Sequence, residues 1–422
     1  MKLKTITRYI IALTLSLCLI TAGCKKNNNT ITIKYSTWGS ETEINILKPI
    51  IKEFEKNNPN IKVDIIHIPQ NYFQKLHMLV AANLAPDVMF INNLNMPVYA
   101  SGNILSDLNY SLSNSSKISH KDFFPQSLKT MSYNKNLMAI PRDISNIVIY
   151  YNKDLFNKYN VEYPQENWNF EEFLEKAQQL TIDINNDKKI DIFGISFETN
   201  AIFFLPFVWS QGGNLFDKKN QHFALTEKNS CTALQFYTDL RNKYKVAPTA
   251  AEAGNSTMAQ MFMQQKLAMF ISGRWSVPRF RTDLDFEWDI ASFPSGKAGS
   301  IVGIDGSGWS MYSKTKHPKE SWMLIEYLAS NKSIAEFSKT GLIVPSRKDV
   351  AFSENFINKD LPPEHAEIFL TIIDNGKPTP KTERWNEVID LINIAMEPVW
   401  NGKQKSCPAL QSIKSSVNEL LE

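Results

Sequence analysis

The stretch Asp87-Val88-Met89-Phe90-Ile91 is a short, almost continuously apolar run. Runs of this length are typical of strands that are buried on both faces of a parallel sheet. Upstream, alternating apolar residues predict strands over 31–35 and 61–65, and apolar residues at helical spacing predict helices over 44–54 and 76–80. The resulting order of strand, helix, strand, helix, strand predicts an α/β fold.

Parallel sheets of this kind bind ligands in the crevice beyond the carboxyl ends of their strands. The segments that leave the first and third predicted strands, residues 36–43 and 92–95, are therefore candidates for a binding site.

Further elements follow in the remainder of the chain. Residues 144–151 form another apolar run, and Asn169 with Glu172 three residues later has the pattern of a helix cap. From 318 to 421 the chain is mostly helical, with helices predicted over 322–328, 365–373, 385–396 and 410–421.

Residues 283–290 alternate strictly between apolar and acidic side chains. We interpret them as a half-buried strand whose acidic residues, Asp283, Asp285, Glu287 and Asp289, face water. This interpretation is favoured over a carboxylate metal site.

The N-terminus has the three regions of a secretion signal. Lys2, Lys4 and Arg8 precede an apolar run over 9–20, and Thr21-Ala22-Gly23-Cys24 resembles a bacterial lipobox. The apolar run is too short to span a bilayer, which needs about 20 residues. We expect residues 1–23 to be a removed signal peptide, Cys24 to carry lipid, and the polar residues 24–30 to be a tether.

Composition predicts a soluble domain on that tether. The chain has 422 residues, of which 43% are hydrophobic, and this length suggests two or more lobes. Removal of 1–23 takes away three basic side chains and no acidic ones, so basic and acidic residues become equal in number. Nothing in this balance indicates nucleic acid as a partner.

Two cysteines remain in the expected mature domain, Cys231 and Cys407. One disulfide is possible in an oxidising location, but two isolated cysteines are more often separate buried thiols, and the sequence leaves the pairing open.

Known catalytic and cofactor motifs are absent from the sequence. There is no His-Glu-x-x-His or Cys-x-x-Cys pair, no nucleotide-binding glycine motif and no Gly-x-Ser-x-Gly elbow. We therefore expect no metal and no cofactor. A glycosidase needs only two suitably separated carboxylates, so the sequence does not exclude that class of enzyme.

A loop over 183–191 partly matches a calcium-binding pattern. Asp183, Asn185, Asp187 and Asp191 have suitable spacing, but Lys188 stands where glycine is needed and Gly194 where glutamate is needed. A solvated turn is the favoured interpretation.

Tryptophans next to glycines are the main candidates for ligand binding. They occur at Trp38-Gly39, at Trp209 before Gly212-Gly213, at Gly273 with Trp275, in Gly306-Ser307-Gly308-Trp309, and near the chain end at Trp385. Indoles stack on the apolar faces of sugars, and glycine lets the backbone approach. Each tryptophan alone is more often a packing residue, but their joint occurrence favours a sugar site.

The order of several short motifs resembles that of the family 1 extracellular solute-binding proteins, the receptors that deliver carbohydrates to ABC importers. The motifs are Ser36-Thr37-Trp38-Gly39-Ser40, Ala85-Pro86-Asp87-Val88, Tyr99-Ala100-Ser101-Gly102, Tyr150-Tyr151-Asn152-Lys153-Asp154-Leu155-Phe156, Ala268-Met269-Phe270 with Gly273 and Trp275, Phe293-Pro294, and Gly341 to Pro345. The resemblance implies a two-lobed periplasmic-binding-protein-like fold of type II, with a ligand cleft between lobes that crossing segments join.

On this resemblance, lobe 1 comprises 31–140 plus 304–342, and lobe 2 comprises 143–302 plus 346–422. The crossings fall near 139–143, 302–308 and 342–347. The resemblance also implies permease transmembrane subunits as partners, a monomeric receptor, and an extracytoplasmic location at the bacterial cell membrane through Cys24.

The resemblance further implies a set of ligand-binding residues spread over both lobes. They are Trp38, Glu43, Asn92 and Asn93 from lobe 1, Asp143 at the first crossing, Trp209, Trp275 and Trp385 from lobe 2, Gly306, Gly308 and Trp309 along the returning strand, and Arg347.

The expected function is sugar binding without chemistry, in which a ligand that touches both lobes shifts the protein toward a closed form. Three alternatives stay open: a receptor for a non-sugar solute on the same fold, a secreted glycoside hydrolase, and a surface adhesion lipoprotein.

Overall fold

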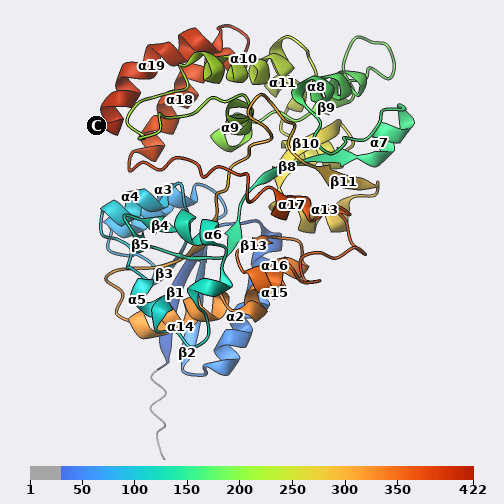
Figure 1. Ribbon diagram of the computed structural model, residues 1–422. Coiled ribbons are helices and arrows are strands. Elements are labelled where there is room, and N and C mark those ends of the chain that lie inside the picture. The colour runs from blue at the N-terminus through green and yellow to red at the C-terminus, as the bar shows by residue number, and fades with distance from the viewer. Residues whose placement is uncertain (1–29) are drawn as a thin grey trace, which may run out of the picture.

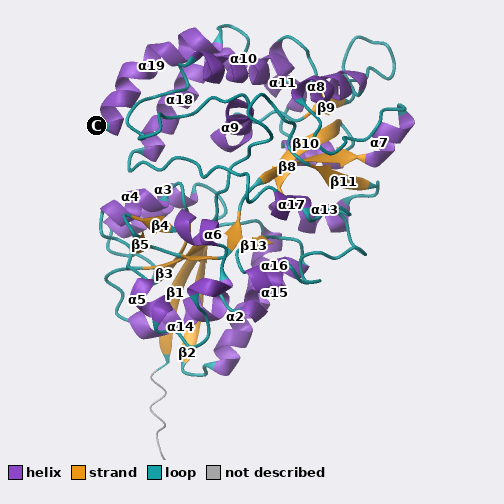
Figure 2. Cartoon of the chain, viewed as in Figure 1, coloured by secondary structure: helices purple, strands orange, loops and turns teal. Residues whose placement is uncertain are grey.

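The computed structural model describes residues 30–422, so the predicted signal peptide and Cys24 lie outside the described residues. The chain forms two α/β lobes, one above the other in Figure 1, and each lobe has its own sheet. In Figure 2 the strands lie inside each lobe and the helices surround them. The predicted two-lobed α/β fold is confirmed.

Lobe 1 is built on a five-stranded mixed sheet. In spatial order its strands are β2 (Ile61–His67), β1 (Ile31–Thr37), β3 (Val88–Asn92), β12 (Ser307–Met311) and β6 (Ile140–Pro141). Strand β1 runs parallel to β2 and β3, whereas β12 is antiparallel to β3 and β6. Because β1 and β3 are parallel, their carboxyl ends lie at one edge, as the sequence predicted.

Helices cover both faces of this sheet. The first, α2 (Glu41–Asn57), begins at a capping box between Ser40 and Glu43 and buries its apolar side, including Leu47 and Phe54. The other helices of lobe 1 are α3 (Tyr72–Ala81), α4 (Met96–Ser101), α5 (Asn109–Ser113), α6 (Pro125–Thr130), α14 (Pro318–Leu328), α15 (Asn331–Lys339) and α16 (Lys348–Ala351). A short hairpin joins β4 (Ser132–Tyr133) to β5 (Asn136–Leu137).

Lobe 2 is built on a four-stranded sheet. In spatial order its strands are β11 (Trp288–Ala291), β8 (Ile147–Asn152), β10 (Leu267–Gly273) and β9 (Phe193–Ile195). Strand β8 is antiparallel to both of its neighbours. The helices of this lobe are α7 (Lys153–Lys158), α8 (Phe170–Gln179), α9 (Ala201–Ser210), α10 (Lys228–Asn242), α11 (Ala250–Ala253), α12 (Met258–Met263), α13 (Val277–Asp283), α17 (Ile368–Thr371), α18 (Trp385–Trp400) and α19 (Ser406–Leu421).

Each lobe has its own hydrophobic core. The core of lobe 2 is rich in aromatic residues: the ring of Phe207 stacks on Phe170 at a centroid distance of 5.3 Å and packs on Tyr237 at 4.8 Å. Separate cores allow the lobes to move as rigid units about the segments that join them.

The hinge between the lobes consists of short paired segments. Strand β7 (Asp143–Ile144) pairs with β13 (Val344–Pro345). Ser145 and Asp305 exchange backbone hydrogen bonds of 2.8 and 3.0 Å. Three passages of the chain therefore lie side by side at the junction.

A fourth segment, the interlobe strap (residues 377–384), leads into α18 and runs between the two lobes in Figure 1. At its start, the amide of Ile304 donates to the carbonyl of Lys377 at 2.9 Å. At its other end, the Lys381 ammonium donates to the carbonyls of Thr130 and Ser132, at 2.6 and 2.9 Å. The strap thus ties the hinge to the C-terminal end of α6 in lobe 1, where a cation is favourable.

The interpretation of 283–290 as one strand was wrong in part. Asp283 ends α13, and only 288–291 form a strand, β11. Asp285 and Glu287 are exposed as predicted, but Asp289 is 1% exposed. The physical reason is that the loop before α17 covers β11, and His365 contacts the Asp289 carboxylate there.

The helix predicted over 365–373 is shorter than expected, since α17 covers only Ile368–Thr371. The helices expected over 322–328, 385–396 and 410–421 are present within α14, α18 and α19.

The sequence left open whether the two remaining cysteines pair. Cys231 on α10 and Cys407 on α19 form a disulfide, with Cα atoms 5.0 Å apart and 176 residues between them in sequence. Packing of α10 against α19 brings them together.

Loop 183–191 has the structure of a turn. The carboxylate of Asp183 accepts from the amides of Asp187 and Lys188, and that of Asp191 accepts from the amide of Ile184. These side chains hold the backbone of the loop, as the turn interpretation predicts.

Among residues 30–422, no helix combines the length and the apolar character that crossing a membrane requires.

Candidate functional site

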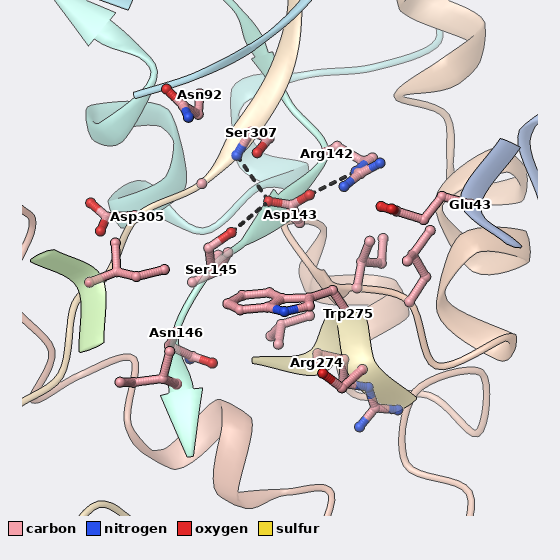
Figure 3. A pocket seen from close by; sticks show the side chains of 18 of the residues that line it. Glu43, Asn92, Arg142, Asp143, Ser145, Asn146, Arg274, Trp275, Asp305 and Ser307 are labelled. Carbon is pink, nitrogen blue, oxygen red and sulfur yellow. Dashed lines mark hydrogen bonds and ion pairs between the residues drawn. The ribbon is translucent and has the colours of Figure 1, made fainter. Parts of the chain in front are cut away.

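A cavity of about 720 Å³ lies between the lobes. Its walls come from both lobes and from the hinge, and Figure 3 shows them from close by. This volume lies within the range of about 300 to 1,000 Å³ that is typical of small-molecule sites.

The lobe 1 wall is formed by the two segments that the sequence placed in the crevice. Trp38 directly follows β1. Asn92 is the last residue of β3, and Asn93 follows it. The first turn of α2 adds Glu43 to this wall. The parallel pairing of β1 with β3 brings these residues to the same edge.

Aromatic packing fixes the position of Trp38. Its ring centroid lies 4.3 Å from that of Phe90, 5.1 Å from Tyr72 and 5.5 Å from Phe73. The side chain is partly buried, so Trp38 both anchors the loop after β1 and lines the cavity.

Glu43 has a structural partner as well as a place in the cavity wall. Its Oε2 accepts from the Ser40 amide at 2.7 Å, and the Ser40 hydroxyl accepts from the Glu43 amide at 3.3 Å. This reciprocal pair caps α2 and holds the carboxylate at the cavity edge.

Trp275 is the main feature of the lobe 2 wall. Its side chain remains 39% exposed, and Figure 3 shows the indole projecting into the middle of the cavity. The ring lies against Gly273, where a Cβ atom would be 2.0 Å from the indole Cζ3. Glycine at this position therefore leaves the space that the indole occupies.

Trp209 reaches the cavity from α9 but is almost completely buried, at 2% exposed. The Lys377 ammonium lies 5.7 Å from its ring centroid. The indole Nε1–H is buried and has no hydrogen-bond partner within residues 30–422.

Asp143 organises the hinge side of the cavity. Its carboxylate accepts from Arg142 Nε at 2.7 Å, from the Ser307 amide at 2.9 Å and from the Ser145 hydroxyl at 3.3 Å. Figure 3 shows these three contacts converging above the indole of Trp275. The Arg142 guanidinium also lies over the ring of Phe90, 4.2 Å from its centroid.

Asp305 connects lobe 1 to the interlobe strap through its carboxylate. Oδ1 accepts from Asn93 Nδ2 of lobe 1 at 2.7 Å, and Oδ2 accepts from the Thr379 hydroxyl of the interlobe strap at 2.8 Å. Removal of water from around the carboxylate raises the pKa of Asp305, and the hydrogen bonds from Asn93 and Thr379 oppose that rise.

Arg274 is a buried cation at the base of the cavity. Its guanidinium lies 4.2 Å from the ring centroid of Phe356, and Nη2 donates to the Phe356 carbonyl at 3.3 Å. Nε and Nη1 have no partner among the described residues, and burial lowers the pKa of Arg274 to about 9.

The structure adds polar residues that the sequence did not single out. Those that line the cavity include Arg142, Ser145, Asn146, Arg274, Ser307 and Thr379. Arg142, Ser145, Asn146 and Ser307 lie at or beside the predicted crossings near 139–143 and 302–308, which were the available signal for them. Arg274 directly follows β10 and Thr379 lies in the interlobe strap, and no signal in the sequence marked these two.

Eight of the twelve ligand-binding residues expected from the sequence line the cavity. The residues present in the wall are Trp38, Glu43, Asn92, Asn93, Asp143, Trp209, Trp275 and Gly306. Gly306 approaches closely because its amide donates to Asn93 Oδ1 at 3.1 Å.

Trp309 does not line the cavity, contrary to the sequence expectation. It is 0% exposed in the core of lobe 1, where its Nε1–H donates to the Tyr35 hydroxyl at 3.0 Å. Its neighbour Gly308 also lies outside the cavity, and a Cβ there would be 2.3 Å from the carbonyl oxygen of Ile140. Close strand packing accounts for this glycine.

Arg347 and Trp385 are the other two expected residues that lie away from the cavity. Arg347 is 5% exposed and forms a bidentate pair with Asp349 at 3.0 and 2.7 Å, so it supports the packing near α16. Trp385 is 6% exposed at the start of α18 and belongs to the core of lobe 2.

This arrangement suits the binding of a polar, uncharged or weakly charged molecule with an apolar face. An exposed indole faces hydrogen-bonding groups from both lobes, and the two carboxylates at the hinge already have partners. The fold and cavity define a two-lobed binding protein with its ligand site between the lobes.

The chain belongs to the bacterial extracellular solute-binding protein family, whose model matches residues 38–335. It is 23% identical over 430 residues to the galactooligosaccharide-binding protein of Bacillus subtilis, covering 96% of this chain and 95% of that protein. It is 23% identical over 344 residues to the multiple sugar-binding protein of Streptococcus mutans, covering 76% of this chain and 77% of that protein.

A solved structure has the same fold. The ABC substrate-binding protein Lmo0181 of Listeria monocytogenes, in complex with cycloalternan, superposes with a TM-score of 0.85 at 24% sequence identity. The match covers 92% of this chain and 98% of that one. The expected family and the two-lobed binding-protein fold are thereby confirmed.

Proposed function

We propose that this protein is the substrate-binding lipoprotein of an ABC importer and that it binds a sugar or oligosaccharide between its lobes. The observation that carries the proposal is the exposed indole of Trp275, which stands in a cavity lined by hydrogen-bonding groups of both lobes. Indole faces stack on the apolar faces of pyranose rings, while amides and carboxylates bind the hydroxyl groups. Sugar binding by relatives of this fold supports the same assignment.

The mechanism is closure of the lobes around the ligand. A sugar stacked on Trp275 contacts lobe 2 only, and it gains the contacts of Trp38 and Asn92 when lobe 1 approaches. Because only the closed form provides both sets of contacts, ligand binding shifts the population toward that form. The closed form is then recognised by the permease, and the lipid on Cys24 holds the receptor at the extracytoplasmic side of the membrane.

The test is a thermal-shift screen of soluble protein that begins at Lys25, against mono- and oligosaccharides with amino acids and polyamines as controls. A ligand at about a hundred times its Kd stabilises a protein by about 2.7 kcal/mol. We expect one class of sugar to raise Tm. Trp275→Ala should abolish the shift, whereas Tyr110→Ala, which removes an aromatic side chain that is 79% exposed outside the cavity, should leave it unchanged.

Two outcomes would overturn the assignment. If a charged solute raises Tm and no sugar does, the protein is a binding protein of the same fold for a non-sugar ligand. Formation of a shortened saccharide on long incubation would show a glycoside hydrolase instead of a receptor.

A further inference from the structure

A second cavity, of about 820 Å³, lies in lobe 2 on the side of β11 and α13. Its wall includes Lys153, Glu287, Glu364 and His365, and it shares only Phe280 with the wall of the interlobe cavity. The sugar site proposed above therefore uses none of its polar side chains.

Three side chains with metal-ligating atoms meet beside this second cavity, and two of them belong to its wall. The three are Asp289 on β11 and the adjacent residues Glu364 and His365, which precede α17. One oxygen of each carboxylate and one ring nitrogen of the imidazole all lie within 4.8 Å of one another. They form the one group of three or more such side chains within residues 30–422 that has this spacing.

Asp289 is held firmly at the base of the group. Its side chain is buried, and its Oδ1 accepts from the amides of Ile290 at 2.9 Å and His365 at 3.2 Å. Its Oδ2 lies 2.6 Å from Nδ1 of His365. A buried carboxylate requires a compensating positive partner, and here that partner is the half-exposed imidazole.

The imidazole and Asp289 are already close to the separation of two ligands of one ion. Ligand atoms that bind Zn²⁺ at about 2.0 to 2.2 Å in a tetrahedral site are roughly 3.3 Å from one another. The distance from Oδ2 to Nδ1, now 2.6 Å, would therefore need to lengthen by about 0.7 Å. Glu364 is exposed, so its side chain is free to swing in as the third ligand.

We propose that Asp289, Glu364 and His365 form a three-ligand site for a divalent transition-metal ion, with Zn²⁺ the ion that this set suits best. One imidazole nitrogen and two carboxylate oxygens are ligands that zinc accepts, and a site with three protein ligands leaves its fourth position to water. The backbone amides that hold Asp289 act as the supporting shell of such a site.

Lys153 is the neighbouring group that opposes the ion. Its ammonium lies 4.0 Å from the Glu364 carboxylate and 3.7 Å from that of Glu287. A metal ion would have to take Glu364 from this ammonium, so removal of the positive charge should strengthen metal binding. A variant that binds the ion more tightly cannot be explained by loss of folding, which would only weaken binding.

The experiment is calorimetric titration of chelator-treated protein, residues 25–422, with ZnCl₂, followed by Co²⁺ as a spectroscopic probe. We expect one ion per chain, visible absorption bands of Co²⁺ in a low-coordinate site, and at least about tenfold weaker binding in His365→Gln and Asp289→Asn. Lys153→Gln should bind Zn²⁺ more tightly. Glu367→Gln, which removes a nearby carboxylate outside the group, should bind as the unchanged protein does.

His365→Gln changes an exposed side chain, so it keeps the test valid if Asp289→Asn fails to fold. The proposal is overturned if the protein binds no Zn²⁺ at millimolar concentration, or if His365→Gln and Glu367→Gln weaken binding equally. The titration contains no sugar, and its result is independent of the result of the sugar screen.

Discussion

The indole of Trp275 rests on the backbone of Gly273, two residues earlier in the chain, and a Cβ atom on that glycine would lie 2.0 Å from Cζ3 of the ring. The backbone at Gly273 has φ −100°, which any residue can adopt. The three atoms nearest to such a Cβ all belong to the indole. This glycine determines where the proposed stacking surface lies.

The first prediction concerns that contact. Gly273→Ala should displace the indole and weaken sugar binding by about tenfold or more, equivalent to about 1.4 kcal/mol, as measured by calorimetry with the sugar found in the screen. In a Trp275→Ala background the same change should have no further effect, because the group that it displaces is gone. Additive losses in the double variant would contradict this explanation.

The second prediction separates Trp309 from the ligand site. Trp309→Phe removes the hydrogen bond to Tyr35 and leaves a space in the core of lobe 1, so the free energy of unfolding should fall by about 1 to 3 kcal/mol. Sugar affinity should not change, since the side chain lies outside the cavity. Urea denaturation and calorimetry measure the two quantities. If Trp309→Phe weakens sugar affinity and leaves the free energy of unfolding unchanged, Trp309 belongs to the ligand site after all.

The third prediction concerns the disulfide between Cys231 and Cys407, which closes a long loop. Cys407→Ser should lower the free energy of unfolding by about 2 to 5 kcal/mol. A reducing agent should bring the unchanged protein to the stability of the variant and should leave the variant as it is. Equal stability of the unchanged protein with and without reductant would show that the bond does not form in solution.

The fourth prediction concerns pH and Asp305. Burial raises the pKa of this carboxyl in the folded protein, so the native state holds the proton more tightly than the unfolded chain, where the pKa is about 3.9. The stability that this group contributes is therefore present below the unfolded pKa and is lost as pH rises through the folded pKa.

Asp305→Asn removes this titration and keeps an acceptor for Asn93. Between about pH 4 and neutrality, the difference in unfolding free energy should shift in favour of the variant. Urea denaturation at both pH values gives the difference, and Asp64→Asn on the exposed side of β2 is the control. A difference that stays constant with pH would contradict the raised pKa.

The local elements of the fold could be predicted from the sequence where one periodicity dominates. The strands β1, β2 and β3 and the helix α2 have regular apolar spacing, so their positions and the edge that carries Trp38 and Asn92 followed from it. The resemblance to a family then placed the crossings, and with them Asp143.

Contacts between distant segments could not be predicted in the same way. The alternation around Asp289 indicated a strand but not the loop, more than 70 residues later, that covers it. Trp309 stands beside a glycine in the sequence, yet which side of β12 faces the core depends on pairing with β3 and β6. The spacing of Cys231 and Cys407 gives no information about the packing of α10 on α19.

The interlobe strap limits the directions in which the lobes can separate. During a rotation, the displacement of each atom grows with its distance from the axis. The contacts of Lys381 with the carbonyls of Thr130 and Ser132 can persist only if the axis passes near them. An axis elsewhere would stretch and break both bonds. An opening motion that keeps both bonds would therefore have its axis near the C-terminal end of α6.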